Sequence, residues 1–393
     1  MTPGARVQAA IECLDRIVDG APAEKALTNW ARNSRFAGSK DRAAVRDHVY
    51  EALRLWWSSA VRGGGTTGRA RMIGALRGAE APVATLFTGV GHAPAPLSPE
   101  EVSGGRVPDG ADALDVPDWL LPELERSLGA DLPPVMDLMR HRAPPFLRAN
   151  LRKATRDRAI MALAADGIEG VAHPLSPTAI EVTRGARAIR RCAAYTEGLV
   201  EIQDAASQAV VDALPLEGTD RILDFCAGGG GKSLAMAGRH AAAYRAHDAV
   251  PNRMTDVPAR AARAGVHIHR LDGAALSRQA PYDLVLVDAP CSGSGSWRRD
   301  PEGKRRLTPE GLSGLTVLQD RVLDAAAPHV RPDGVLCYVT CSLLDVENGA
   351  RVAAFLDRAP FVETDRFILT PLDGGDGFFC AILRRNCGEN GGS

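Results

Sequence analysis

Apolar residues recur at helical spacing through most of the first 140 positions. Two stripes stand out among the first eighty residues, one formed by Val7, Ile11, Leu14 and Val18 and one by Val45, Val49, Leu53 and Trp56. Over residues 79–117 the chain becomes rich in Pro and Gly with clustered acids, which indicates a linker or loosely packed excursion. Helical spacing returns over 119–140. We therefore predict an all-α domain over residues 1–140.

The next sixty residues change to a mixed pattern. Residues 146–150 read as a strand, 156–166 as a helix and 179–182 as another strand. This order predicts a small α/β module over residues 141–198.

From residue 199 short apolar runs alternate with helical patterns of ten or more residues. The runs lie at 222–223, 244–247, 266–271, 284–287 and 335–339. Such alternation predicts a parallel, doubly wound, Rossmann-like sheet with helices on both faces. Residues 361–369 and 378–383 look like a closing antiparallel pair. This third domain is expected over 199–385, followed by a disordered tail over 386–393.

Composition narrows the class of protein. The 393 residues are 45% hydrophobic and 24% charged, which suits a globular chain with a large core and excludes a disordered one. The eight Cys include no C-x-x-C pair, so no metal site is expected. Residues 1–20 carry charges where a secretory signal needs apolar residues, and the longest uncharged stretch, 81–99, is broken by Pro and Gly. We expect a cytoplasmic protein with reduced thiols and no membrane partner.

The net charge is −1, but the charged residues are distributed unevenly along the chain. Residues 1–77 hold 13 basic and 7 acidic side chains, and residues 138–200 hold 11 and 5, whereas residues 78–137 hold 2 and 11. Of the 47 basic residues 42 are Arg, whose planar group suits bidentate phosphate contacts. A genome biased toward G and C also inflates Arg, so these segments alone leave nucleic-acid binding open.

A glycine-rich loop follows the first strand of the third domain. Its residues are Cys226, Ala227, Gly228, Gly229, Gly230, Gly231 and Lys232. Glycines let a backbone approach a ligand closely, and the start of the next helix favours negative charge. A phosphate-binding P-loop would need Gly at position 226, where the chain has Cys. The other ligand is S-adenosylmethionine, whose carboxylate would meet the loop.

Acids follow four successive strands of the same domain. They are Asp224, Asp248, Asp272 and Asp288. Carboxyl ends of parallel strands share the ligand-binding edge of a sheet, and Asp248 stands 24 residues after Asp224, near the spacing of a ribose-binding acid. Each acid alone could simply cap a helix or turn. The four together with the glycine loop favour a cofactor site.

Two cysteines lie in loops that follow the fourth and fifth strands. Cys291 stands in the segment 288–295 and Cys341 in 340–342. A methyl donor beside a thiolate suits methylation at carbon 5 of a pyrimidine, because thiolate addition to carbon 6 makes carbon 5 nucleophilic. Asp288 would hydrogen-bond the cytosine edge.

The motifs around these residues resemble those of the RNA (cytosine-5) methyltransferases. The resemblance rests on Asp-Ala-Pro-Cys-Ser-Gly-Ser-Gly (288–295), Thr-Cys-Ser (340–342), Ile-Gln-Asp-Ala-Ala-Ser-Gln (202–208) and Asp-Gly-Phe-Phe (376–379). Gly-Ser-Lys-Asp-Arg (38–42) and Val-Tyr-Glu-Ala-Leu-Arg (49–54) resemble the NusB-like RNA-binding domain of the Sun-type branch, which acts on bacterial small-subunit rRNA.

This resemblance implies roles for individual residues. Cys341 matches the family's nucleophile and Cys291 the cysteine that assists product release; residues 226–232 match the cofactor loop, and Asp248, Asp272 and Asp288 its acids. Arg253 is a further candidate for cofactor binding. The family loop usually reads Cys-Ala-Ala-Pro-Gly-Gly-Lys, so two extra glycines here are expected to loosen the free loop.

The sequence thus predicts a monomeric S-adenosylmethionine-dependent enzyme that methylates carbon 5 of a cytosine in RNA, with 16S rRNA the expected substrate and DNA excluded. The open alternatives are a tRNA cytosine-5 methyltransferase, a P-loop nucleotidase and a catalytically idle RNA-binding assembly factor.

Overall fold

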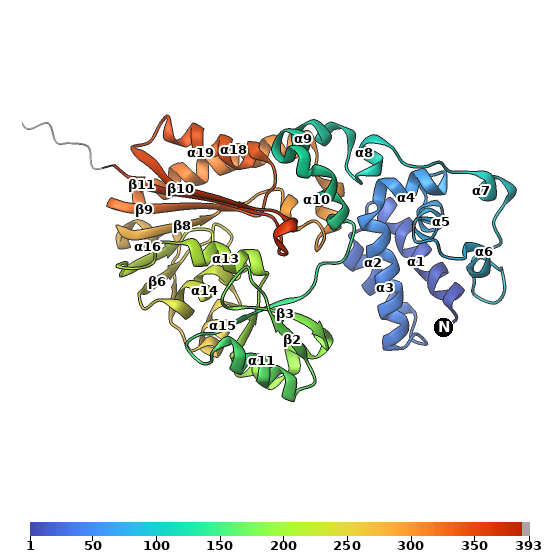
Figure 1. Ribbon diagram of the computed structural model, residues 1–393, viewed down its shortest axis with the longest axis horizontal. Helices are drawn as coiled ribbons and strands as arrows, with labels where there is room; N and C mark the ends of the chain where they lie inside the picture. The colour runs from blue at the N-terminus through green and yellow to red at the C-terminus, as the bar shows by residue number, and fades with distance from the viewer. Residues whose placement is uncertain (387–393) are drawn as a thin grey trace, which may run out of the picture. The chain divides into compact units, whose positions relative to one another are not determined.

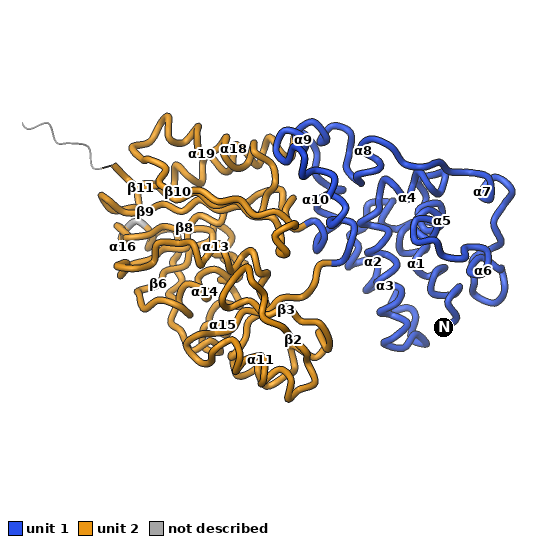
Figure 2. The backbone as a smooth tube through the Cα atoms, viewed as in Figure 1, with its two compact units in different colours: residues 1–142, 297–309 blue, residues 143–296, 310–393 orange. Residues whose placement is uncertain are grey.

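The computed structural model describes residues 1–386, and its backbone forms two compact units (Figures 1 and 2). Unit 1 comprises residues 1–142 and 297–309, and unit 2 comprises residues 143–296 and 310–393. Apart from Asn386, the tail predicted over 386–393 lies outside the described residues. The segment 297–309 was placed by sequence within the third domain, but the structure groups it with the N-terminal helices.

Unit 1 contains only helices among its described elements. They are α1 (Pro3–Val18), α2 (Ala23–Asn33), α3 (Ser39–Arg54), α4 (Trp56–Gly63), α5 (Gly68–Gly78), α6 (Val83–Leu86), α7 (Pro99–Ser103), α8 (Gly110–Ala113), α9 (Leu121–Leu128), α10 (Leu132–Met139) and α17 (Pro301–Arg306), with short 3-10 turns at Asp118–Leu120 and Gly129–Asp131. The first predicted apolar stripe lies on α1, and the second lies on α3 except for Trp56, which begins α4; all of these residues but Val18 are buried. This confirms that the first 140 residues are helical; their likeness to NusB stays a prediction.

The excursion over 79–117 is better anchored than its composition suggests. Phe87 is buried in the helical core. The fully buried Asp115 accepts hydrogen bonds from the backbone N–H groups of Trp57 and Ser58 and forms an ion pair of 2.9 Å with Arg140. Most residues of the segment are nevertheless exposed, so a few buried side chains anchor a stretch that has little regular structure.

Unit 2 contains a small four-stranded antiparallel sheet. Its strands are β1 (Phe146–Ala149), β2 (Glu169–Ala172), β3 (Ala179–Arg184) and β4 (Val200–Ile202), in the order β2-β3-β1-β4. Helices α11 (Arg156–Ala165) and α12 (Ala193–Thr196) accompany it, and Leu163 of α11 shares a core with Leu147 and Ile180. Strand β4 lies beyond the predicted boundary at residue 199.

The larger sheet of unit 2 has seven strands in the order β10-β11-β9-β8-β5-β6-β7. Strands β5 (Arg221–Asp224), β6 (Ala243–Ala246), β7 (Ile268–Arg270), β8 (Tyr282–Asp288) and β9 (Val330–Thr340) are parallel, whereas β10 (Phe361–Leu369) and β11 (Phe378–Arg385) are antiparallel to their neighbours. The predicted Rossmann-like sheet and its closing hairpin are thus confirmed.

Helices cover both faces of this sheet (Figure 1). Leu284 and Leu286 of β8 pack with α13 (Ala205–Ala213), α14 (Gly231–Arg239) and α15 (Val257–Ala264). The alternate residues Val285 and Val287 pack with α16 (Gly273–Gln279), α18 (Pro309–Ala326) and α19 (Gly349–Leu356). A strand buried on both sides reads as a continuous apolar run, which is why the sequence revealed it.

Candidate functional site

The candidate site lies at the carboxyl ends of neighbouring parallel strands. Asp224 ends β5 and Asp288 ends β8, and Cys341 directly follows β9. Because β9, β8, β5 and β6 are consecutive in the sheet, the predicted residues after these strands share one edge.

The glycine loop joins β5 to α14. Gly228 and Gly230 have φ angles of +50° and +76°, which L side chains rarely adopt. A side chain on Gly228 would meet no atom within 4 Å, so this part of the loop faces open space. Asp248, nearly buried, fixes the loop by accepting the Gly228 N–H at 2.9 Å, and it also accepts the Val250 N–H at 2.8 Å.

Asp224 lies beneath the loop. Its Oδ2 accepts a hydrogen bond of 2.5 Å from the Ser233 hydroxyl, whereas its buried Oδ1 has no partner among the described residues. Burial raises the pKa of Asp224 to about 7, although the Ser233 bond works against this rise. Burial likewise raises the pKa of the neighbouring Cys226 thiol, so Cys226 is not poised to react.

Lys232 and Asp288 form a largely buried ion pair. Lys232 Nζ lies 2.7 Å from Asp288 Oδ2 and 4.9 Å from the ring centre of Phe378. Burial alone would lower the pKa of Lys232, but the attraction of Asp288 prevails and raises it. Lys232 is therefore a fixed positive charge inside the site.

The two predicted cysteines are in contact. Their Sγ atoms lie 3.4 Å apart, and both residues are partly exposed. The hydrogen bond from Cys291 lowers the pKa of the Cys341 thiol, Lys232 lowers it further, and the same bond raises the pKa of Cys291. Cys341 is thus the thiol of the pair that more readily becomes a thiolate.

Glu347 ties the two cysteine loops together, and sequence reasoning missed it. This fully buried carboxylate accepts hydrogen bonds from the Ser292 N–H at 2.8 Å, from the Ser342 hydroxyl at 2.5 Å and from Gln319 Nε2 at 3.0 Å. Ser292 and Ser342 each follow one of the cysteines in the chain. Sequence alone cannot distinguish Glu347 from a surface acid such as the nearby Asp345, which is exposed.

Two other motifs meet beside the cysteine loops. Asp204 Oδ1 accepts the Asp376 N–H at 3.0 Å and so joins segment 202–208 to segment 376–379. Gly295 donates its N–H to the Cys341 carbonyl at 2.9 Å, and its own carbonyl accepts the Gly377 N–H at 2.8 Å. Segments distant in sequence are thus bonded into one scaffold.

Asp272 and Arg253 lie apart from this bonded group. Asp272 is exposed and caps α16, where its Oδ1 accepts the Ala275 N–H at 2.7 Å. The Arg253 side chain is 60% exposed and lies 3.8 Å from Asp248 Oδ2. The cap that was weighed as an alternative for each acid is present at Asp272, whose part in cofactor binding stays a prediction.

Among the described residues, no helix is long and apolar enough for a membrane span, and no three His, Cys, Asp or Glu side chains are gathered in a way that could hold a metal ion.

Comparison with known proteins identifies the family. Residues 211–384 match the model described as 16S rRNA methyltransferase RsmB/F, and residues 116–188 match an RsmF/B-like ferredoxin-like domain. The ribosomal RNA small subunit methyltransferase B of Erwinia tasmaniensis is 32% identical over 300 residues, which cover 70% of this chain and 67% of that protein. Its counterpart in Klebsiella pneumoniae subsp. pneumoniae is 34% identical, over 69% of this chain and 66% of that protein. The chain belongs to the RsmB/F methyltransferase family.

Solved structures share the fold of this RsmB/F member. The crystal structure of PH0851 covers 98% of this chain and 99% of its own at a TM-score of 0.75 and 21% identity. A methyltransferase homologue from Pyrococcus horikoshii covers 70% of this chain and 97% of its own, with a TM-score of 0.62 and 23% identity.

The cofactor of RsmB/F enzymes is S-adenosylmethionine, as predicted. The site of this member fits such a ligand, because the loop at Gly228 is open and Asp248 keeps lone pairs beyond its two backbone bonds. The same site suits a nucleoside triphosphate poorly, because it offers little uncompensated positive charge. Lys232 is already neutralised by Asp288, and the loop is further bordered by the carboxylate of Asp248.

Proposed function

We propose that this RsmB/F member methylates carbon 5 of a cytosine in small-subunit rRNA through a covalent bond between Cys341 and carbon 6 of the base. The observation that carries the proposal is the pair of sulfur atoms 3.4 Å apart, with Lys232 close to the thiol whose pKa is lowered. The relatives in Erwinia and Klebsiella are named as small-subunit rRNA methyltransferases, which supports rRNA over tRNA.

Each step of the reaction has a residue in the site. The Cys341 thiolate adds to carbon 6, and the electron pair of the 5,6 double bond makes carbon 5 nucleophilic. S-adenosylmethionine, when bound, supplies the electrophilic methyl group. Once Cys291 has released its own thiol proton to water, it accepts the proton from carbon 5, directly or through a water molecule. The double bond re-forms, and the Cys341 sulfur leaves carbon 6 as a thiolate.

Asp288 suits recognition of cytosine. Its Oδ2 binds Lys232, but its Oδ1 has no hydrogen bond to another described residue, and the side chain is one third exposed. A free carboxylate oxygen accepts from the amino group of cytosine, which uracil lacks.

A catalytically idle assembly factor is the second candidate, and the scaffold around the cysteines argues against it. Glu347, Gly295 and the Asp204–Asp376 contact all fix loops that a binding protein would have no need to fix.

The two cysteines are tested by single substitutions and denaturing electrophoresis with labelled rRNA. We expect Cys341→Ala to form neither product nor adduct, because attack cannot occur. Cys291→Ala is expected to attack, methylate and then stall as a denaturant-resistant protein–RNA complex. Cys192→Ala is the thiol control, because Cys192 packs in the separate core of the small sheet, and this variant should behave as the unmodified enzyme.

A trapped adduct with Cys341→Ala and none with Cys291→Ala would reverse the two roles. Bisulfite mapping of total RNA from a strain that lacks the gene identifies the modified cytosine. A loss of 5-methylcytosine from tRNA alone would overturn the rRNA assignment.

A further inference from the structure

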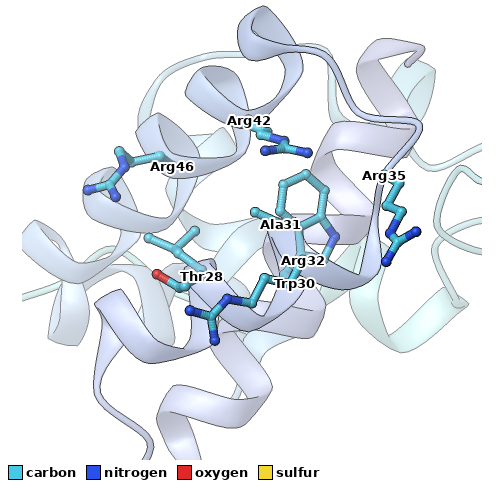
Figure 3. A pocket seen from close by; sticks show the side chains of 8 residues that line it. Thr28, Trp30, Ala31, Arg32, Arg35, Arg42 and Arg46 are labelled. Atoms are coloured by element: carbon cyan, nitrogen blue, oxygen red, sulfur yellow. The ribbon is translucent and has the colours of Figure 1, made fainter.

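Helices α2 and α3 of unit 1 enclose a pocket lined by arginines (Figure 3). Its volume is about 390 Å³, and its walls are Leu27, Thr28, Trp30, Ala31, Arg32, Arg35, Arg42 and Arg46. Figure 3 shows the guanidinium groups arranged around Trp30. Arg42 and Arg46 come from one face of α3, one turn apart, and Arg32 and Arg35 come from the end of α2 and the connection that follows it.

Three of the four positive charges are not compensated. Arg46 is neutralised by Glu24, which lies 2.6 Å away. Arg42 donates only its Nε, to the Ala37 carbonyl at 3.0 Å, and no ion pair to Arg32, Arg35 or Arg42 occurs within residues 1–386. Holding like charges together without a partner costs free energy, which a bound anion recovers.

An exposed aromatic residue stands next to the pocket in the chain. Phe36 follows Arg35 and is 74% exposed, although large apolar side chains in unit 1 are mostly buried. Arginines beside an exposed aromatic ring combine the two contacts that single-stranded RNA offers, namely phosphate groups and stackable bases.

We propose that this pocket binds the phosphate backbone of a single-stranded stretch of the RNA substrate through Arg32, Arg35 and Arg42, while Phe36 stacks on a neighbouring base. The proposal rests on the proposed function for the identity of the RNA. It adds a binding site remote in sequence from the cysteines, so each can be tested without the other.

The test measures binding of a labelled single-stranded rRNA fragment to the full chain at several salt concentrations. Each lost phosphate contact lowers the slope of log K against log salt by about 0.7. We expect Arg32→Ala, Arg35→Ala and Arg42→Ala each to lower the slope by that amount. Phe36→Ala is expected to weaken binding at least about fivefold with no change of slope.

Arg16→Ala is the control, because Arg16 is exposed on α1 of the same unit but does not line the pocket. Affinity for S-adenosylmethionine reports whether each variant is folded and should stay constant. Slopes that fall equally for Arg16→Ala and the pocket variants would overturn the proposal. They would indicate that RNA is attracted by positive charge spread over the surface of unit 1 and not by the pocket. Unchanged slopes would also overturn the proposal, and a simultaneous loss of binding to the ribosomal subunit would then assign the pocket to a protein partner.

Failure here can be distinguished from failure of the proposed function. The adduct on Cys291→Ala reports on the reaction site, so an adduct together with unchanged slopes in the pocket variants removes the pocket and leaves the activity. Pocket-dependent binding without any adduct or product removes the activity and leaves the pocket.

Discussion

Carboxylates at equivalent positions in the sequence of this enzyme have different structural roles. Asp248 and Asp272 both follow strands, yet Asp248 is nearly buried against the glycine loop, whereas Asp272 is exposed and caps a helix. Sequence places an acid at a strand end but does not reveal which groups it meets, because that depends on where the following loop turns.

Asp248→Ala should weaken S-adenosylmethionine binding. Two ribose hydroxyl contacts to a carboxylate would be lost, each on the order of 1.5–3 kcal/mol, and Gly228 would lose its anchor. Calorimetry measures the change. Asp272→Ala is the matched substitution: a fall in affinity supports cofactor contact, whereas reduced stability with unchanged affinity leaves Asp272 as a helix cap alone. Unchanged affinity in Asp248→Ala would contradict the ribose assignment.

Glu347→Gln should impair catalysis without affecting either ligand. The amide presents an N–H₂ group to donors that need an acceptor, so the Ser292 and Ser342 contacts weaken and the cysteine loops shift. We expect kcat to fall at least about tenfold, KM for RNA to hold, and Cys341 to react more slowly with iodoacetamide. The exposed Glu310→Gln is the control. A fall in KM and kcat together, or equal effects in both variants, would argue against a positioning role for Glu347.

Elements were predictable from sequence where burial imposed a pattern. The central strands β8 and β9 contain long runs of buried apolar residues and were found. By contrast, β2 is exposed along most of its length and contains a glycine, so the sequence gave no indication of it. The cysteines and the glycine loop could be found because they share strand ends. The bonds that join their loops could not, since backbone contacts such as that of Gly295 leave no residue-type signature.

Gly295→Ala should disrupt the loop scaffold. A Cβ there would lie 2.1 Å from the Gly377 carbonyl oxygen, so the Cys291 loop must move away from segment 376–379. We expect a loss of unfolding free energy of about 1–3 kcal/mol and a large loss of activity. Gly314→Ala is the control, because that glycine lies in α18 with open space around it and should gain roughly 0.5–1 kcal/mol. Denaturant titration of both variants measures the difference, and a tolerated Gly295→Ala would contradict the close contact.

At the scale of the whole molecule, unit 1 contains a lysine supplied from late in the chain. Lys304 of α17 is 1% exposed; its Nζ lies 5.6 Å from the ring centre of Trp57, and burial lowers its pKa to about 8. The unfolded chain therefore holds this proton up to about pH 10, whereas the folded chain releases it from about pH 8. The free energy of unfolding should rise with pH across this window.

Lys304→Met removes this titration, so the rise of roughly 1–3 kcal/mol between pH 7.5 and 10 should disappear. Denaturant titration over this pH range tests the prediction. Lys25→Met, on the exposed side of α2, should keep the rise seen in the unmodified protein. A rise of the same size in Lys304→Met would assign it to other groups.

The path of the chain also bears on its synthesis. Arg54 of α3 donates to the carbonyl of Arg298, and Arg305 lies over the ring of Trp56, so α3 and α4 acquire neighbours that are translated some 240 residues later. An N-terminal unit usually folds first as it leaves the ribosome. Here unit 1 emerges first, but helices α3 and α4 lack these neighbours until most of unit 2 has been synthesised. Residues 1–142 expressed alone should therefore be less stable than the same residues joined to 297–309, and a nascent chain halted before residue 297 should be unusually sensitive to protease.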